Sequence, residues 1–166
     1  MRKLDMRENK TRGFLITVCG LDGCGKTTML NRIFSDLKTD NELFLTKQPT
    51  NYVRESKIFR NYMDSPCHDD FDYRSLSLLA ASDRLQHVNK VIEPAMNEGR
   101  IVLSDRYFYS CLANLRARGF KNDEWIYEIA KSVIKPDIAF FFDVSVDNHI
   151  VSPVAFSMAH NNCFNI

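Results

Sequence analysis

The sequence predicts an α/β fold, a three-layer sandwich in which a mostly parallel sheet is flanked by helices. Two observations lead to this prediction. Short apolar segments rich in β-forming residues alternate with amphipathic helical patterns, which is typical of βαβ units. A glycine-rich stretch also stands between the first apolar segment and the first helical pattern, where such folds bind ligands. The strands are expected at residues 14–19, 43–46, 101–104 and 138–144.

Three longer helices are expected between these strands. Apolar residues recur at three- and four-residue steps in residues 26–37, 73–96 and 123–134. The helix over 73–96 is the longest, and Glu98-Gly99 ends it just before the third strand. Lys135-Pro136 closes the last helix, because the residue before a proline avoids helical geometry. A further short edge strand is compatible with residues 154–158, after Pro153.

Length and composition favour one domain and exclude several classes of partner. The 166 residues carry a net charge of +1, so no basic excess indicates nucleic acid or an anionic membrane. The apolar run at 138–142 is far too short to span a bilayer. Five cysteines without a CxxC pair favour free thiols in a reducing cytoplasm. We expect a flexible, solvated tail over 1–12, a domain over 13–147 and an atypical C-terminal tail over 148–166.

The glycine-rich stretch matches the phosphate-loop pattern G-x-x-x-x-G-K-[ST] in its strand–loop–helix context. Backbone N–H groups of such a loop bind phosphate oxygens, and the helix N-terminus adds positive potential. Lys26 is expected on the β- and γ-phosphates of ATP, Thr27 on Mg²⁺ and Thr28 on the α-phosphate. A chance glycine-rich turn is the alternative, and the flanking strand and helix disfavour it. The predicted ATP-binding residues are Gly20, Gly23, Cys24, Gly25, Lys26, Thr27 and Thr28.

A second motif follows the third strand, in the segment RIVLSDRYFYS (residues 100–110). Asp105 and Arg106 stand at the carboxyl end of that strand, where ligands bind in open α/β sheets. Asp105 suits a magnesium ion held through water, and Arg106 suits an acceptor phosphate. The alternative is an exposed Asp–Arg pair of little consequence.

Taken together, these motifs resemble the thymidylate kinase family. The resemblance runs from about residue 13 to residue 147 and includes the segments GLDGCGKTT, LTKQPT, SLLAASDRLQHVNKVIEPA, VLSDRYFYSCLA and KPDIAFFFDVSVD. It implies a P-loop NTPase fold of the nucleoside monophosphate kinase type. It also implies transfer of the ATP γ-phosphoryl group to dTMP, which gives dTDP, with Mg²⁺ as cofactor. The family is usually dimeric through its long helices, so a homodimer is possible.

The resemblance assigns roles to individual residues. Asp105 and Arg106 match the catalytic aspartate and the arginine on the acceptor phosphate, and Lys26 completes the predicted catalytic set. Lys47 stands where the family usually has an arginine on that phosphate, and lysine is a point charge instead of a fork. The other implied substrate-binding residues are Asp22 at the sugar 3′-hydroxyl, Pro49, Arg84 at the thymine edge and Ser110 in the base pocket.

Three positions depart from the family pattern. Ala80 replaces an aromatic residue that stacks on thymine, and Asn114-Leu115 replaces a Tyr-Gln pair. Stacking from Phe71, Tyr73 or Tyr107 is an alternative, although each of these suits the core or the rim of the pocket better. Arg84 has a second interpretation as an exposed helix cation paired with Asp83 or with a neighbouring helix turn.

Two other clusters carry simpler interpretations. The segment Cys67-His68-Asp69-Asp70 contains metal-binding residue types, but a loop capping the next helix explains it better. Cys111 is expected to be a small packing residue, because no activating base can be placed beside it.

The C-terminal part of the chain differs most from the family pattern. The family continues with a lid that carries arginines, whereas this chain has no Lys or Arg after Lys135. Another family type carries an arginine in the phosphate loop, at the position of Gly23. Slow transfer that is poorly coupled to ATP consumption is therefore expected. The alternative is a nucleotide-binding protein of the same fold with little or no catalysis.

Overall fold

The computed structural model describes residues 2–37, 42–121, 123–143 and 155–158. Four parallel strands form the centre of the molecule: β1 (Phe14–Gly20), β2 (Leu43–Lys47), β3 (Ile101–Asp105) and β4 (Ile138–Asp143). Their order is β2-β3-β1-β4, and β5 (Ala155–Met158) adds an antiparallel edge beside β4. The predicted α/β fold with a mostly parallel sheet is confirmed, and β5 falls within the expected edge strand at 154–158. The rest of the predicted C-terminal tail lies outside the described residues.

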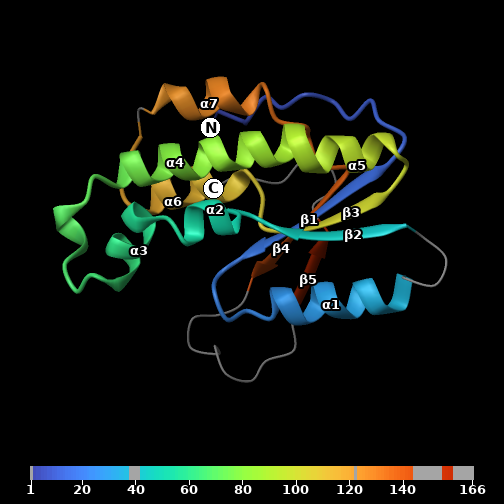
Figure 1. Ribbon diagram of the computed structural model, residues 1–166, viewed down its shortest axis with the longest axis horizontal. Helices are drawn as coiled ribbons and strands as arrows, with labels where there is room; N and C mark the ends of the chain where they lie inside the picture. The colour runs from blue at the N-terminus through green and yellow to red at the C-terminus, as the bar shows by residue number, and fades with distance from the viewer. Residues whose placement is uncertain (1, 38–41, 122, 144–154, 159–166) are drawn as a thin grey trace.

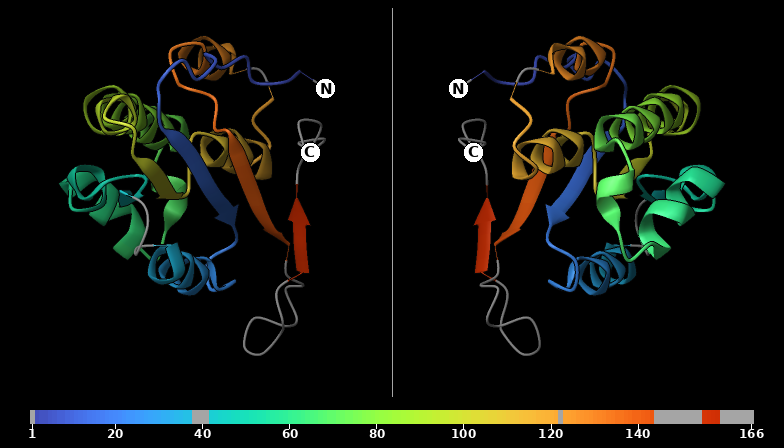
Figure 2. Two further views of the ribbon diagram at one scale, coloured as in Figure 1. Left: turned by 90° about the vertical axis from the view of Figure 1, so that its right-hand side faces the viewer. Right: turned by 90° about the vertical axis from the view of Figure 1, so that its left-hand side faces the viewer.

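Helices cover both faces of the sheet (Figure 1). One face carries α1 (Lys26–Leu37), which encloses a small core with Val18, Leu103 and Phe142. The other face carries the helices that enclose the larger core. These are α4 (Tyr73–His87), the π-helical turn η2 (Val88–Ile92), α5 (Glu93–Asn97), α6 (Tyr109–Ala117) and α7 (Glu124–Ala130). Figure 2 shows the same layers from the side, with β5 at the edge next to β4.

Two expected helices differ in detail from the structure. The helix expected over 73–96 is present as α4, η2 and α5 in succession, and the π-helical turn buries Val88 and Ile92 completely. The helix expected over 123–134 ends at Ala130, because Val133 and Ile134 enter the core in a non-helical segment instead. Between β2 and α4, the chain forms α2 (Asn51–Arg54), α3 (Lys57–Asp64) and the short 3₁₀ helix η1 (His68–Asp70).

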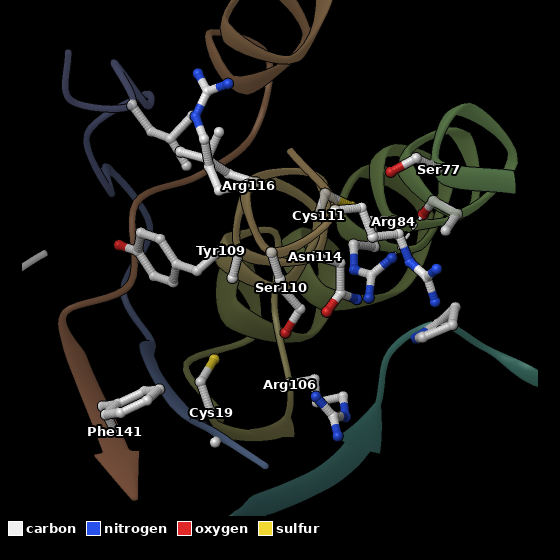
Figure 3. A pocket seen from close by; sticks show the side chains of 18 of the residues that line it. Cys19, Ser77, Arg84, Arg106, Tyr109, Ser110, Cys111, Asn114, Arg116 and Phe141 are labelled. Atoms are coloured by element: carbon white, nitrogen blue, oxygen red, sulfur yellow. Dashed lines mark hydrogen bonds between the residues drawn. The ribbon is translucent and has the colours of Figure 1, made fainter. Parts of the chain in front are cut away.

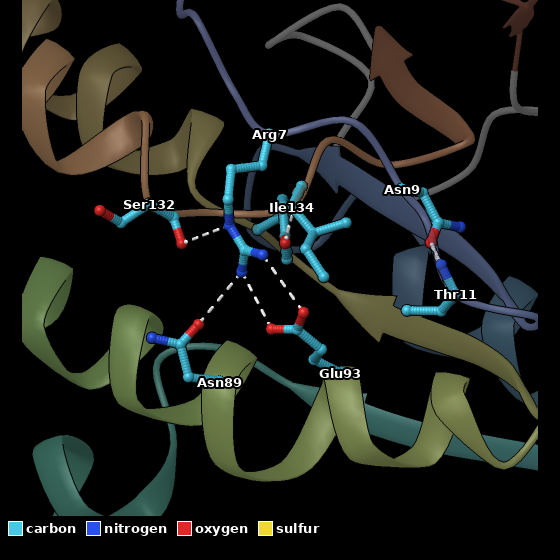
Figure 4. A network of polar contacts seen from close by, with 8 residues as sticks. Arg7, Asn9, Thr11, Asn89, Glu93, Ser132 and Ile134 are labelled. Atoms are coloured by element: carbon cyan, nitrogen blue, oxygen red, sulfur yellow. Dashed lines mark hydrogen bonds and ion pairs between the residues drawn. The ribbon is translucent and has the colours of Figure 1, made fainter.

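The N-terminal segment differs from the expected solvated tail. Met6 is buried in the larger core, and Arg7 pairs with Ile134 in a parallel β-bridge. The guanidinium group of Arg7 donates hydrogen bonds to Glu93 at 2.9 Å and to Asn89 at 3.4 Å (Figure 4). The first twelve residues contain five lysines and arginines, which favoured a solvated tail. Burial of Met6 and the charge-assisted hydrogen bond of Arg7 instead hold this segment against the domain. No helix within the described ranges is both long and apolar enough to cross a bilayer.

Candidate active site

A cavity of about 660 Å³ opens beside the carboxyl ends of the parallel strands. Its walls come from the phosphate loop, the segment after β2, and helices α3, α4 and α6, with β4 at the far side. Figure 3 shows Arg84 from α4, Arg106 from the turn after β3, and Ser110 and Asn114 from one helix converging on it. Parallel sheets place ligands at this edge, so the cavity is the candidate substrate site.

The phosphate loop runs from the end of β1 to the start of α1, as its sequence pattern predicts. Its geometry requires glycine at two positions for different reasons. A β-carbon at Gly20 would lie 2.8 Å from the carbonyl oxygen of Phe142, closer than packing allows. Gly23 has open space around it, but its φ of +79° lies in the left-handed region that other residues adopt only with strain. Both positions are therefore suited to glycine, as the tight turn of a phosphate-binding loop requires.

Lys26 is buried at the start of α1 and folds back into the loop. Its ammonium group donates a hydrogen bond to the carbonyl oxygen of Leu21 and lies 3.4 Å from the sulfur of Cys24. Thr28 is exposed on the first turn of the same helix. This arrangement places a positive charge and the helix N-terminus at one point, which suits a polyphosphate chain.

Asp105 joins the loop to the neighbouring strands. Its Oδ2 atom accepts a hydrogen bond from Thr27 at 3.1 Å and lies 3.6 Å from the ammonium group of Lys47. Its Oδ1 atom is buried and has no hydrogen-bond partner among the described residues. A buried carboxylate oxygen beside a threonine hydroxyl fits Mg²⁺, which uses one or two protein oxygens and completes its shell with water and phosphate. No group of three or more metal-binding side chains occurs among the described residues.

Lys47 faces the loop side of the sheet instead of the cavity. The strands pair Val18, Lys47 and Asp105 in register, so their side chains project from the same face. Lys47 accordingly pairs with Asp105 and is not among the residues that line the cavity. The structure thus brings Lys47 to Asp105 and Thr27, whereas the family resemblance implied a place on the acceptor phosphate.

Arg106 is the next residue after Asp105, and its side chain lines the cavity instead of facing Lys47. Its φ of +69° is a left-handed conformation, held by a 2.8 Å hydrogen bond from its own N–H to Val18 and by Ser104, whose hydroxyl donates to the Arg106 carbonyl. Its guanidinium group forms an ion pair with Asp22 of the phosphate loop. The interpretation of Asp105 and Arg106 as an exposed pair fails, because Asp105 is buried and the two residues have different partners.

The Asp22–Arg106 pair links the loop to the cavity wall. Partial desolvation would raise the pKa of Asp22, but the charge of Arg106 and its hydrogen bond outweigh this effect. Lys26 and Arg54 add to the effect, so the pKa of Asp22 lies below its ordinary value. Asp22 is therefore an anion at neutral pH, bound to a cation that an incoming phosphate can also bind.

Arg84 lies in the wall formed by α4, where it is only 3% exposed. Its Nη1 atom donates to the carbonyl oxygen of Ala80 at 3.0 Å, while its Nε atom has no partner in the described structure. Asp83 accepts from the backbone N–H of Thr50 at 2.7 Å and thereby ties α4 to the segment after β2. The interpretation of Arg84 as an exposed cation paired with Asp83 is therefore wrong.

The remaining predicted residues complete the cavity. Pro49 and Ser110 line it, and Ser110 is buried. Tyr107 is a core residue whose hydroxyl donates to Ile134 at 2.7 Å, so it offers no stacking surface. Tyr73 lines the cavity, but the guanidinium group of Arg118 stands 4.0 Å from its ring centre. Phe71 packs edge-on against Tyr62 and is not among the lining residues.

Sequence reasoning missed several charged residues of the cavity, among them Arg54. It ends the four-residue helix α2 and lines the cavity, with its Nε atom donating to the carbonyl oxygen of Pro49 at 2.7 Å. The only available signal was a cation a few residues after the T-K-x-P segment. Such a position means little until the fold of the intervening residues is known.

Comparison with known proteins identifies the family. The model of the thymidylate kinase family matches residues 18–153. A protein named "probable thymidylate kinase" from Pyrococcus horikoshii is 39% identical over 140 residues, which are 81% of this chain and 67% of that protein. The thymidylate kinase of Lactobacillus helveticus is 34% identical over 139 residues, covering 81% of this chain and 65% of the relative.

A solved structure agrees with these sequence matches. The crystal structure of thymidylate kinase from Ehrlichia chaffeensis superimposes with a TM-score of 0.64 at 27% identity, over 79% of this chain and 71% of that one. The matched region contains the phosphate loop from Val18 onward and all the residues that line the cavity after it. The chain therefore belongs to the thymidylate kinase family.

Proposed function

We propose that this chain transfers the γ-phosphoryl group of ATP to dTMP, giving ADP and dTDP. The observation that carries the proposal is the junction between two sites. A phosphate loop on one side and an arginine-lined cavity on the other meet at the ion pair between Asp22 and Arg106. A donor and an acceptor phosphate bound on either side of this pair would face each other, as phosphoryl transfer requires.

The donor side would bind ATP through the loop N–H groups, with Lys26 on the β- and γ-phosphates and Thr28 on the α-phosphate. Thr27 and Asp105 would hold Mg²⁺, which, when bound, neutralises charge on the phosphate oxygens. In the reaction, an oxygen of the acceptor phosphate forms a bond to the γ-phosphorus while the bond to the β-bridging oxygen breaks. Charge neutralisation and positioning supply most of the catalysis, so no strong general base is needed.

The acceptor side would bind the nucleoside monophosphate with its phosphate at Arg106 and its base at Arg84. Arg84 offers only hydrogen-bond donors, so it suits a base edge that carries a carbonyl oxygen, as thymine does. Ser110 and Pro49 would shape the pocket, and Asp22 would accept a hydrogen bond from the sugar 3′-hydroxyl. The family name of the relatives supports thymine as the base.

The test is a mixture of the purified chain, ATP and Mg²⁺ with each deoxynucleoside monophosphate in turn. We expect dTDP from dTMP and little product from the other nucleotides. Because Gly23 provides no arginine in the phosphate loop, we expect ADP to form in excess over dTDP. ATP binding without any diphosphate product would instead support a nucleotide-binding protein, an alternative that the family membership does not favour. Brisk transfer with equal amounts of ADP and dTDP would contradict the predicted poor coupling.

We further propose a homodimer that associates through the long helical segment of residues 73–96. The resemblance to a family that is usually dimeric through its long helices supports this interface. Leu78 on α4 is a large apolar side chain exposed on this segment. Sedimentation equilibrium would measure the mass, and Leu78→Glu should shift a dimer toward monomer.

A further inference from the structure

The guanidinium group of Arg54 lies at the cavity wall, and only its Nε atom makes a hydrogen bond to a described residue. Its Nε atom donates to the carbonyl oxygen of Pro49 at 2.7 Å, which anchors the side chain next to the backbone of its own turn. Its two Nη atoms have no hydrogen bond or salt bridge in the described part of the chain. Arg54 is half-buried and lines the cavity, so this free fork can meet a ligand there.

The surroundings of Arg54 carry an excess of positive charge. Burial lowers the pKa of Arg54, and the charges of Arg106 and Arg84 lower it further, against the opposing effect of Asp105 and Asp22. These carboxylates are already engaged, since Asp22 pairs with Arg106 and Asp105 binds Thr27 and Lys47. Arg54, Arg84 and Arg106 are three of the six arginines that line the cavity, and their mutual repulsion is costly unless an anion binds among them. A nucleoside monophosphate brings about two negative charges on its phosphate.

Each of the three arginines suits a different part of such a ligand. Arg84 is deepest, bonded to the backbone of α4 beside Ser77 and Cys111, where a base would fit. Arg106 contacts the phosphate loop through Asp22 and so lies nearest the donor. Arg54 stands on α2 and feels the charges of both other arginines. Lys47, the cation expected on the acceptor phosphate, instead faces Asp105 on the other side of the sheet.

We propose that Arg54, together with Arg106, binds the phosphate of the acceptor nucleotide and occupies the place that the sequence pattern suggested for Lys47. The planar fork of arginine can contact two phosphate oxygens at once, which a lysine cannot do with fixed geometry. This inference rests on the proposed function, because it requires a nucleoside monophosphate in the cavity.

A purely structural role for Arg54 makes a different prediction. If Arg54 served only to brace the turn at Pro49, its removal would disturb the cavity for any ligand. If it binds phosphate, its removal would affect only ligands that carry one. Thymidine and dTMP share base and sugar and differ only in the phosphate, so comparing them separates the two roles.

The experiment measures the dissociation constants of dTMP and thymidine by calorimetry for wild type, Arg54→Ala, Arg54→Lys and Lys47→Ala. Loss of a charge-assisted hydrogen bond predicts about 10- to 100-fold weaker dTMP binding for Arg54→Ala, with thymidine binding unchanged. Arg54→Lys should recover part of the loss, because it keeps the charge without the fork. Lys47→Ala should leave dTMP binding within about 3-fold of wild type. Arg60→Ala is the matched control, since Arg60 is an exposed cation on α3 paired with Asp64.

Several results would overturn the inference. Equal losses for thymidine and dTMP in both Arg54 variants would make Arg54 a structural residue. Unchanged dTMP binding in Arg54→Ala, or a large loss of dTMP affinity in Lys47→Ala alone, would indicate that Lys47 and not Arg54 binds the acceptor phosphate. If wild type binds neither ligand, the proposed function fails together with the inference. If wild type binds dTMP and the Arg54 variants bind it equally well, only the inference fails.

Discussion

The two ends of the site are built in different ways. The donor end consists mainly of one continuous stretch, in which Lys26 contacts Leu21 and Cys24 only a few residues away, and Asp105 is its one distant member. The acceptor end takes Arg54 from α2, Arg84 from α4 and Arg106 from the turn after β3, residues that are distant in sequence. The proposed donor end would bind mainly through backbone N–H groups, whereas the proposed acceptor end would bind through side chains that tertiary contacts hold in place.

This difference indicates how each end can be damaged. A backbone cradle survives most side-chain substitutions, provided that the glycines keep its shape and that Lys26 supplies the charge. A cavity made of side chains depends on distant supports, such as the hydrogen bond from Thr50 to Asp83 that ties α4 to the segment after β2. Substitutions at one end should therefore leave the affinity of the other largely intact.

The largest expected effect is at the donor end. Lys26→Ala removes the charge proposed to face the β- and γ-phosphates, so the affinity for ATP should fall about 10²–10³-fold through the loss of charge-assisted hydrogen bonds to both. Binding of dTMP should stay within about 3-fold of wild type, because Lys26 does not line the cavity. Calorimetry with each ligand measures both effects, with exposed Lys57→Ala on α3 as the control. Unchanged ATP binding in Lys26→Ala would refute the phosphate-loop interpretation.

The next effect is at the acceptor end and separates binding from stability. Arg106→Ala should weaken dTMP binding about 10- to 100-fold and spare ATP binding, because a charge-assisted contact to the acceptor phosphate is lost. Arg106→Gly should lose the same affinity but be more stable than Arg106→Ala by about 1 kcal/mol, since glycine adopts a φ of +69° without strain. Urea unfolding measures the stability difference. Weakened ATP binding with normal dTMP binding would move Arg106 to the donor site.

The same difference explains what could be predicted from the sequence. The strands and the phosphate loop were predictable, because periodicity and an eight-residue motif are local signals that survive without knowledge of the fold. The face on which Lys47 lies depends on its register with Asp105, which no local pattern specifies. Arg54 escaped notice for the same reason, since α2 is too short to show a helical period.

The N-terminal segment shows a second limit of sequence patterns. Its charged composition favours solvation. Arg7 nevertheless donates hydrogen bonds to Glu93 and to the backbone carbonyl of Val133, which are far away in the sequence. Pairing of distant charges is invisible in a single sequence. The π-helical turn η2 is similarly hidden, because the apolar spacing over 73–96 is close to that of a regular helix.

The smallest expected effect concerns a support of the acceptor end, His87 on α4. Its Nε2 atom shares a 2.7 Å hydrogen bond with the hydroxyl of Thr46, at the end of β2. Burial lowers the pKa of His87 from its ordinary value of 6.5, against a weaker opposing effect of Asp83. The folded state thus favours neutral His87, while the unfolded state binds a proton near pH 6.5. The stabilisation is complete above that pH and declines as the pH falls through 6.5 toward the lower folded value.

Urea unfolding at pH 7.5 and at pH 5.0 measures this decline in wild type and in His87→Gln, which keeps a polar partner for Thr46 without a titrating group. Stability should fall more in wild type than in His87→Gln over this interval. Asp22 does not interfere, because its lowered pKa places its titration below pH 3.8. Thr46 precedes the segment that carries Pro49 and Arg54. As the pH falls, the affinity for dTMP should therefore decrease more than the affinity for ATP. Identical pH dependence of stability in the two proteins would show that protonation of His87 does not weaken the acceptor end, and the contrast between the two ends would then rest on the arginines alone.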